Sequence, residues 1–98
     1  MDFVILMSFR EGLSAEERDE ALVRRAGWQY PDGLVQIAEY WPASESPAVV
    51  VIARAESYEA LMELEMVWAD KFAIEVSPAV SAEDGLRIGP DVMAKVRG

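Results

Sequence analysis

The sequence predicts a small α+β domain because one pattern, an apolar strand, a capped helix and a second strand, occurs twice in its 98 residues. The four strand runs cover residues 3–9, 34–41, 49–53 and 74–80, and the two helices open at Ser14 and Ser57. Two consecutive β-α-β units of this length predict one four-stranded sheet with both helices on the same face.

The polarity of the strands predicts their order in the sheet. Runs 3–9 and 49–53 are apolar at nearly every position, as expected of central strands that are covered on both faces. Runs 34–41 and 74–80 carry alternating polar residues and indicate edge strands. Pro78 agrees with an edge because proline cannot donate to a strand ladder. The expected arrangement is the ferredoxin-like β-α-β-β-α-β fold, an antiparallel sheet of order 4-1-3-2.

The first helix has a clear beginning and a thin apolar face. Ser14 is the expected N-cap and Glu17 completes a capping box. Glu20 and Arg24 are spaced to form an i,i+4 ion pair on an exposed face. The predicted buried stripe is short and includes one acidic residue: Ala15, Asp19, Leu22, Val23 and Ala26.

The second helix is apolar around most of its circumference. One expected stripe consists of Leu61, Leu64, Trp68 and Phe72, and a second consists of Tyr58, Met62, Met66 and Ala69. A helix of this kind is buried on more than one side. In so small a protein, the second side is expected to face another subunit or a ligand.

Residues 1–80 are expected to form the domain and residues 81–98 a C-terminal tail. Residues 81–85 are predicted to form a turn. A short helix with apolar Val92, Met93 and Val96 is predicted to begin at Pro90. We interpret this tail as an arm that docks on the same subunit or on a neighbouring one.

Composition excludes several classes of function. The chain is acidic, with 18 acidic and 9 basic residues and a net charge of −9, which disfavours nucleic acid and anionic membranes as partners. It has no His, Cys, Asn or Thr, so thiolate or imidazole metal sites, cysteine nucleophiles and His-based triads are excluded. No cofactor and no metal are expected. The apolar start reads as a strand rather than a signal peptide, so a cytoplasmic location is expected.

Arginine residues form the first candidate site. Strands one and three are expected to be parallel neighbours, so Arg10 and Arg54 are expected to emerge at the same end of the sheet, beside both helix N-termini. Two guanidinium groups near two helix dipoles could hold an anion or a carboxylate. The alternative is that both arginines pair with the many glutamates expected at that end of the sheet.

An aromatic cluster forms the second candidate site. Its expected members are Trp28, Tyr30, Tyr40, Trp41 and Trp68, with Glu39 and Glu75 nearby on the edge strands. Aromatic walls with a few polar groups are typical of small-ligand clefts, and they are also typical of subunit interfaces. Both interpretations remain open from the sequence alone.

Acidic residues with partly buried positions form the third candidate set. Asp19, Glu65 and Glu75 are expected to be partly covered, and burial raises the pKa of a carboxyl group toward a value useful for general acid–base chemistry. The alternative is that they are ion-paired or exposed. Asp19, Glu39 and Glu75 are the catalytic candidates.

Short motifs add a family resemblance. Pro31-Asp32-Gly33-Leu34 followed by Tyr40-Trp41, and Trp68-Ala69-Asp70 followed by residues 74–78, resemble an uncharacterised prokaryotic family within the dimeric α/β-barrel superfamily. The resemblance covers residues 1–80. It implies a homodimer whose sheets pack face to face, with a cleft between sheet and helices in each subunit. The superfamily's haem enzymes use His and its monooxygenases often pair Asn with Trp, so the missing His and Asn count against both activities.

Three functional hypotheses follow. The first is a homodimeric binding protein for a small apolar or aromatic molecule, with Tyr40, Trp41 and Trp68 as walls and Arg10, Arg54, Glu39, Glu75 and Asp19 as polar contacts. The second is a cofactor-independent monooxygenase or isomerase that acts on an aromatic or lactone substrate. The third is a structural or interaction subunit of a larger assembly, built through the tail.

Overall fold

The computed structural model describes residues 1–98 and contains four strands and three helices. In chain order these are β1 (Asp2–Phe9), α1 (Ala15–Gly27), β2 (Leu34–Tyr40), β3 (Val49–Ala55), α2 (Tyr58–Trp68), β4 (Phe72–Ala79) and α3 (Ala82–Arg97). The sheet order is β2-β3-β1-β4, and every neighbouring pair is antiparallel. This is the predicted ferredoxin-like order 4-1-3-2 written from the opposite edge of the sheet, so the prediction is confirmed.

The strand register decides which side chains share a face of the sheet. Glu39 lies opposite Val51, Val51 opposite Ile5, and Ile5 opposite Val76, so these four side chains point to the same face. Ile5 and Val51 belong to the buried core, which identifies this face as the one covered by the helices.

The next row of the register points the other way. Tyr40 lies opposite Val50, Val50 opposite Leu6, and Leu6 opposite Glu75. Because neighbouring residues in a strand point to opposite faces, this row lies on the open face of the sheet, away from the core. The open face is therefore largely apolar in its centre, although no helix of the chain covers it.

The hydrophobic core lies between the sheet and the two helices α1 and α2. Ile5, Val51 and Leu64 are its most completely buried large side chains. Leu61, Leu64 and Trp68 of α2 enter the core as predicted, while Phe72 belongs to the first position of β4 rather than to the helix. The second apolar stripe expected on α2 is not covered by the rest of the chain, since Tyr58, Met62 and Met66 are exposed. Both helix openings are confirmed, with Ser14 and Ser57 as N-caps.

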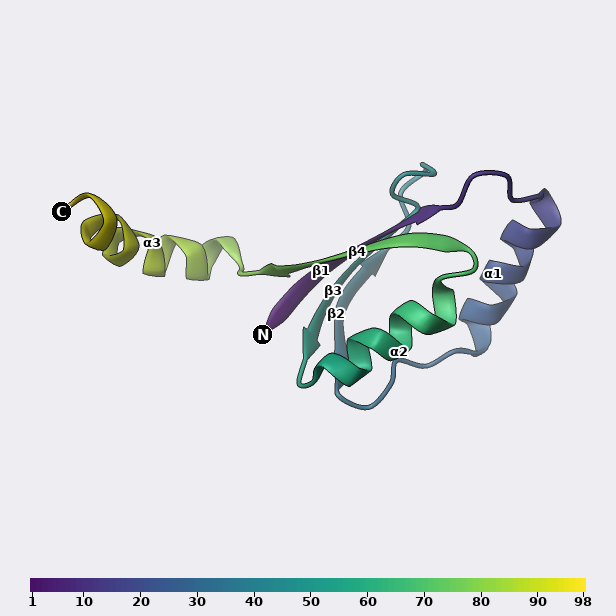
Figure 1. Cartoon of the computed structure of the whole chain (residues 1–98), viewed down its shortest axis with the longest axis horizontal. Coiled ribbons are helices and arrows are strands. Elements are labelled where there is room, and N and C mark those ends of the chain that lie inside the picture. Colours follow the sequence, from purple (N-terminus) through teal and green to yellow (C-terminus); the bar gives the residue numbers. More distant parts are fainter.

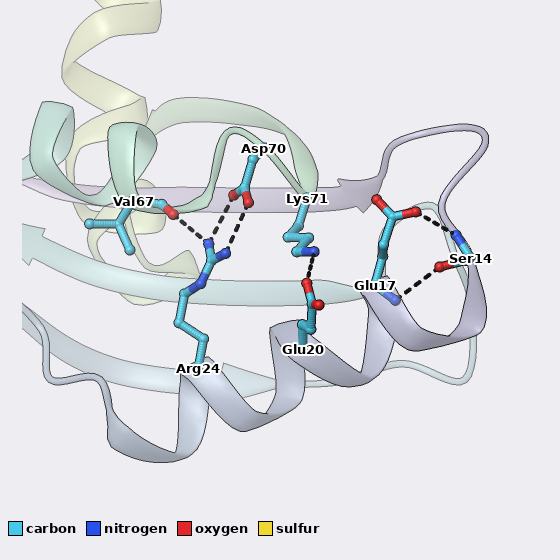
Figure 2. Close-up of polar contacts among 7 residues, drawn as sticks. All are labelled: Ser14, Glu17, Glu20, Arg24, Val67, Asp70 and Lys71. Atoms are coloured by element: carbon cyan, nitrogen blue, oxygen red, sulfur yellow. Dashed lines mark hydrogen bonds and ion pairs between the residues drawn. The ribbon is translucent and has the colours of Figure 1, made fainter.

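Helix α1 is held by polar contacts to the turn between α2 and β4 (Figure 2). The predicted capping box is present, because Ser14 and Glu17 exchange hydrogen bonds of 3.1 Å. The predicted i,i+4 pair is wrong. Arg24 binds the Asp70 carboxylate at 2.8 and 2.9 Å, and Glu20 accepts from Lys71 Nζ at 2.8 Å.

These cross-element pairs replace the local pair because the neighbouring turn offers both partners. Arg24 also donates to the main-chain oxygen of Val67 at 2.7 Å, a second acceptor that an exposed i,i+4 partner could not supply (Figure 2). Lys71 is itself buried, so its ammonium group requires the nearby carboxylate of Glu20. The ion pairs therefore join α1 to the rest of the domain.

The predicted apolar stripe of α1 is also wrong. Ala15, Asp19, Leu22, Val23 and Ala26 are all exposed, and Ala21 is the only buried residue of the helix. The side that faces the sheet carries Arg18, Ala21, Leu22 and Arg25, spaced i, i+3, i+4 and i+7. Leu22 is the one member of the predicted stripe on this side, although it is 56% exposed. Arginine side chains occupy places where a typical amphipathic helix has leucine or valine.

The C-terminal segment is a 16-residue helix rather than a turn followed by a short helix. Ser81 caps it by accepting from the Asp84 N–H at 3.0 Å, so the residues predicted as a turn form its first turn, and Pro90 lies inside it. Figure 1 shows α3 extending away from the sheet, on the side opposite to α1. The molecule consequently measures 56 × 28 × 17 Å. None of the three helices has the combination of length and hydropathy required to span a membrane.

Candidate binding cavity

A cavity of about 240 Å³ lies between α1 and the covered face of the sheet. Its lining comes from β1, α1, β2, β3, α2, the first residue of β4 and the loops after α1 and β2, and 13 of its 18 residues are hydrophobic. Ligand pockets for drug-sized molecules span about 300–1,000 Å³, so this cavity suits a smaller molecule. Its position corresponds to the cleft between sheet and helices that the resemblance implied.

Five aromatic side chains form a continuous wall of the cavity. Their ring centroids follow one another at 4.7 Å, 6.0 Å, 5.6 Å and 4.8 Å, in the order Phe9, Phe72, Trp68, Trp28 and Tyr30. Most of these pairs are tilted or edge-to-face, which are favourable geometries for aromatic rings. We call these five residues the aromatic wall.

Glu39 is the acidic side chain of the cavity and is almost fully covered, with 8% of its side chain exposed. It accepts from Arg25 Nε at 3.1 Å and from the Arg25 terminal nitrogen at 3.0 Å. The Tyr30 hydroxyl and the Trp41 indole N–H, at 2.7 Å, donate to the same carboxylate. The three donors that satisfy the carboxylate come from α1, from the loop after α1 and from the residue that follows β2.

Burial and hydrogen bonds in this cluster shift the pKa values of Tyr30 and Glu39 in opposite directions. Burial by itself would raise the pKa of Glu39, but the hydrogen bonds from Arg25, Tyr30 and Trp41 outweigh it and lower that pKa. Burial, followed by the hydrogen bond to the Glu39 carboxylate, raises the pKa of the Tyr30 phenol. Glu39 therefore stays ionised and Tyr30 stays protonated at neutral pH.

The cavity exists because α1 packs on the sheet through arginine side chains. Arg18 lies over the Phe9 ring at 4.9 Å, Arg24 over Trp68 at 5.2 Å, and Arg25 over Tyr30 at 5.5 Å. A planar guanidinium stacks on an aromatic ring and keeps its charged edge available for hydrogen bonds. With Ala21 as the only buried residue of α1, the space beneath the helix is not filled.

Several residues proposed from the sequence do line this cavity. Trp41 and Trp68 contribute to it, and so do Trp28, Tyr30 and Glu39 of the predicted aromatic cluster. Tyr40 does not, because it points to the open face of the sheet and is 70% exposed. Glu75 lies on that same open face, and Asp19 is exposed on α1. Of the acids predicted to be partly buried, only Glu65 is partly covered, and it lies outside the cavity.

The predicted arginine pair does not form. Strands β1 and β3 are antiparallel rather than parallel, so Arg10 and Arg54 lie at opposite ends of the sheet. Arg54 binds Asp2 at 2.9 Å, and Arg10 donates to the main-chain oxygen of Ala69. Both arginines therefore have structural partners and neither lines the cavity.

Sequence reasoning missed Arg18, Arg25, Phe9 and Phe72 as cavity residues. The spacing of Arg18, Ala21, Leu22 and Arg25 was visible in the sequence, but a search for the most apolar face of α1 passed over a face with two arginines. No group of three or more acidic side chains is placed to hold a metal ion.

A family model described as a domain of unknown function, DUF3303, matches residues 1–92. The chain belongs to this family. The DUF3303 match includes most of α3, so this helix is part of the family's domain. No curated protein and no solved structure matches the chain.

Proposed function

We propose that this DUF3303 protein is a homodimer that binds a small apolar or aromatic molecule in the cavity beneath α1. The observation that carries the proposal is a cavity of about 240 Å³ that combines the aromatic wall with one fully hydrogen-bonded polar cluster. Apolar walls with a few fixed polar groups are typical of sites for small molecules. The dimeric α/β-barrel resemblance supports both the location of the cleft and the homodimer.

The lowered pKa of Glu39 favours a binding function over the alternative monooxygenase or isomerase activity. A general base should have a pKa close to the working pH, but the three donors around Glu39 lower its pKa. Proton abstraction by Glu39 would also require it to release Arg25 or Tyr30. We therefore assign Glu39 the role of positioning Arg25, Tyr30 and Trp41 around the cavity.

Isothermal titration calorimetry with naphthalene-2-carboxamide, a neutral bicyclic probe, tests the binding proposal. Wild-type protein should bind the probe, and Ala21→Phe should abolish binding because Ala21 lines the cavity and a phenyl group would fill it. Ala26→Phe, the same change at an exposed position of the same helix, should bind like wild type. Circular dichroism establishes that both variants are folded. Absence of binding to wild type by both this probe and naphthalene-2-carboxylate, or equal binding of the probe by both variants, would contradict the proposal.

Helix α3 favours self-association through the C-terminal segment. No residue of α3 is buried, and Leu86 and Val96 are 79% and 72% exposed. At 100° per residue all its apolar residues except Ala94 share one side: Ala82, Leu86, Ile88, Val92, Met93 and Val96. Each of its two glycines destabilises an isolated helix by about 1 kcal/mol, and its internal proline destabilises it by about 3 kcal/mol. A helix with this composition needs a covering surface.

We propose that a second copy of the chain supplies that surface. The apolar centre of the open sheet face, with Val4, Leu6, Val50 and Ile52, is also uncovered by the chain's own helices. The two uncovered surfaces lie on different parts of an elongated molecule, so contact between copies can cover both at once.

Light scattering after size-exclusion chromatography tests this assembly. The full chain should elute as a dimer or larger, at twice or more the 10.9 kDa of one chain. Truncation after Val80, and the Val92→Asp variant, should lower the number of chains per particle or weaken association. Ala94→Asp, on the polar side of α3, is the matched control and should assemble like wild type. An unchanged number of chains per particle after truncation would reject a role for α3 in assembly.

A further inference from the structure

The two cations of the cavity differ in how firmly they are held. Arg25 shares a buried carboxylate with Tyr30 and Trp41, and its partner Glu39 is 8% exposed. Arg18 instead pairs with Glu45, a residue of the loop between β2 and β3 whose side chain is 67% exposed. Exposed ion pairs of this kind contribute little to stability, so the Glu45 carboxylate can be displaced at small cost.

Arg18 is nevertheless fixed in position. Its guanidinium carbon lies 4.9 Å from the centre of the Phe9 ring, at one end of the aromatic wall. Only one terminal nitrogen of Arg18 donates to a protein acceptor, the Glu45 carboxylate. A guanidinium has five N–H donors in a planar fork that matches a carboxylate. Arg18 therefore has unused donors at a position where a ligand in the cavity can reach them.

The loop that carries Glu45 stays attached through its main chain. The Phe9 N–H donates to the Glu45 carbonyl oxygen at 3.0 Å, the Ala48 N–H donates to the Met7 carbonyl oxygen at 2.8 Å, and the Ser8 and Ser46 hydroxyls are 3.2 Å apart. Release of the Glu45 side chain from Arg18 breaks none of these contacts. The exchange of one carboxylate for another thus requires no rearrangement of the loop backbone.

We infer that the ligand of this cavity has an apolar, ring-sized body and a carboxylate, and that this carboxylate takes the place of Glu45 on Arg18. The apolar body lies along the aromatic wall and the charged end lies at Arg18. The inference rests on the proposed binding function and adds the chemical class of the ligand. The overall charge of −9 disfavours anions in general, so a local cation with a displaceable partner is what allows an anionic ligand to bind here.

Calorimetric titration with naphthalene-2-carboxylate and its neutral analogue naphthalene-2-carboxamide tests the inference. The carboxylate should bind wild-type protein more tightly than the carboxamide. Arg18→Gln should lower carboxylate affinity by on the order of 10-fold or more, the usual size for a lost charge-assisted hydrogen bond, and leave carboxamide affinity nearly unchanged. Arg87→Gln, an exposed arginine on α3, is the matched control and should change neither affinity.

The Glu45→Gln variant gives the more specific result. Removal of the competing carboxylate should raise naphthalene-2-carboxylate affinity by about 2- to 5-fold, while carboxamide affinity stays the same. Glu63→Gln, an exposed glutamate on α2, controls for the change in net charge. A merely structural role for the Arg18–Glu45 pair predicts that both variants affect the two probes equally.

The outcomes separate the two proposals. Equal affinities of the two probes for wild type, or an Arg18→Gln variant that keeps the carboxylate preference, would overturn the carboxylate inference and leave the binding function standing. Failure of both probes to bind wild type would overturn the binding function and the inference with it.

Discussion

Replacement of Glu39 by alanine should destabilise the protein more than any other single change of a glutamate. The substitution leaves the Arg25 guanidinium, the Tyr30 hydroxyl and the Trp41 indole N–H without their common acceptor. Removal of one partner of a buried ion pair costs about 3–5 kcal/mol. Arg25 keeps 29% of its side chain exposed and Trp41 is also exposed, so water replaces part of the loss.

The expected decrease in the free energy of unfolding is therefore about 2–3 kcal/mol. For a domain of this size, each kcal/mol corresponds to about 4–8 °C in melting temperature, so Glu39→Ala should melt about 8–24 °C below wild type. Urea denaturation followed by far-UV circular dichroism measures the free energy. Glu63→Ala is the matched control, because Glu63 is exposed on α2 and lies away from the open sheet face, and it should stay within about 0.5 kcal/mol of wild type.

The pH dependence of the free energy of unfolding is a second test of the same contact. The pKa of Glu39 is lowered in the folded state from an ordinary value of 4.5, so the carboxylate contributes stability at higher pH and loses that contribution as pH falls through the folded value. Glu39→Gln should show a smaller loss of stability than wild type on acidification below about pH 4.5. If Glu39→Ala costs less than about 1 kcal/mol, the reasoning that three donors depend on this carboxylate is refuted.

Three further predictions concern other contacts. The Arg24 guanidinium lowers the pKa of Asp70 from 3.8 to about 2, so Asp70→Asn should flatten the loss of stability between these pH values, measured by urea denaturation at several pH values. Because the pKa of Tyr30 is raised, its contribution is present below its ordinary value of 10.0 and is lost at higher pH. Tyr30→Phe should therefore lose less stability above pH 10.0, and the phenol with the raised pKa should disappear from an absorbance titration. Gly33 has a φ of 89°, so Gly33→Ala should cost about 1–2 kcal/mol in the same denaturation assay, whereas Gly27→Ala, a control in open space, should cost nothing.

The element order and the sheet order could be predicted because they depend on local patterns. Capping at Ser14 and Ser57 and the alternation of polar residues in β2 and β4 are properties of short segments. The C-terminal helix was predicted less well. A proline at position 90 suggested a helix start, whereas Ser81 caps the helix nine residues earlier and the proline lies within it.

The candidate site could be predicted only in part, because its composition depends on register and on helix rotation. Glu39 and Tyr40 are adjacent in the sequence, and one points into the cavity while the other points to the open face. A shift of one residue in strand pairing would exchange them. Similarly, the face that α1 turns toward the sheet is set by Arg24 and Arg25, whose partners Asp70 and Glu39 lie on other elements.

The sequence alone therefore determined the two β-α-β units, the order of the strands and the chemical groups that are absent, since each follows from residue types and local spacing. The tertiary structure decided the opposite ends occupied by Arg10 and Arg54, the burial of Glu39 rather than Glu75, and the space left beneath α1. These features arise from contacts between residues that are distant in the chain. The energies of these contacts depend on which partners the fold brings together, and local sequence patterns do not determine those partners.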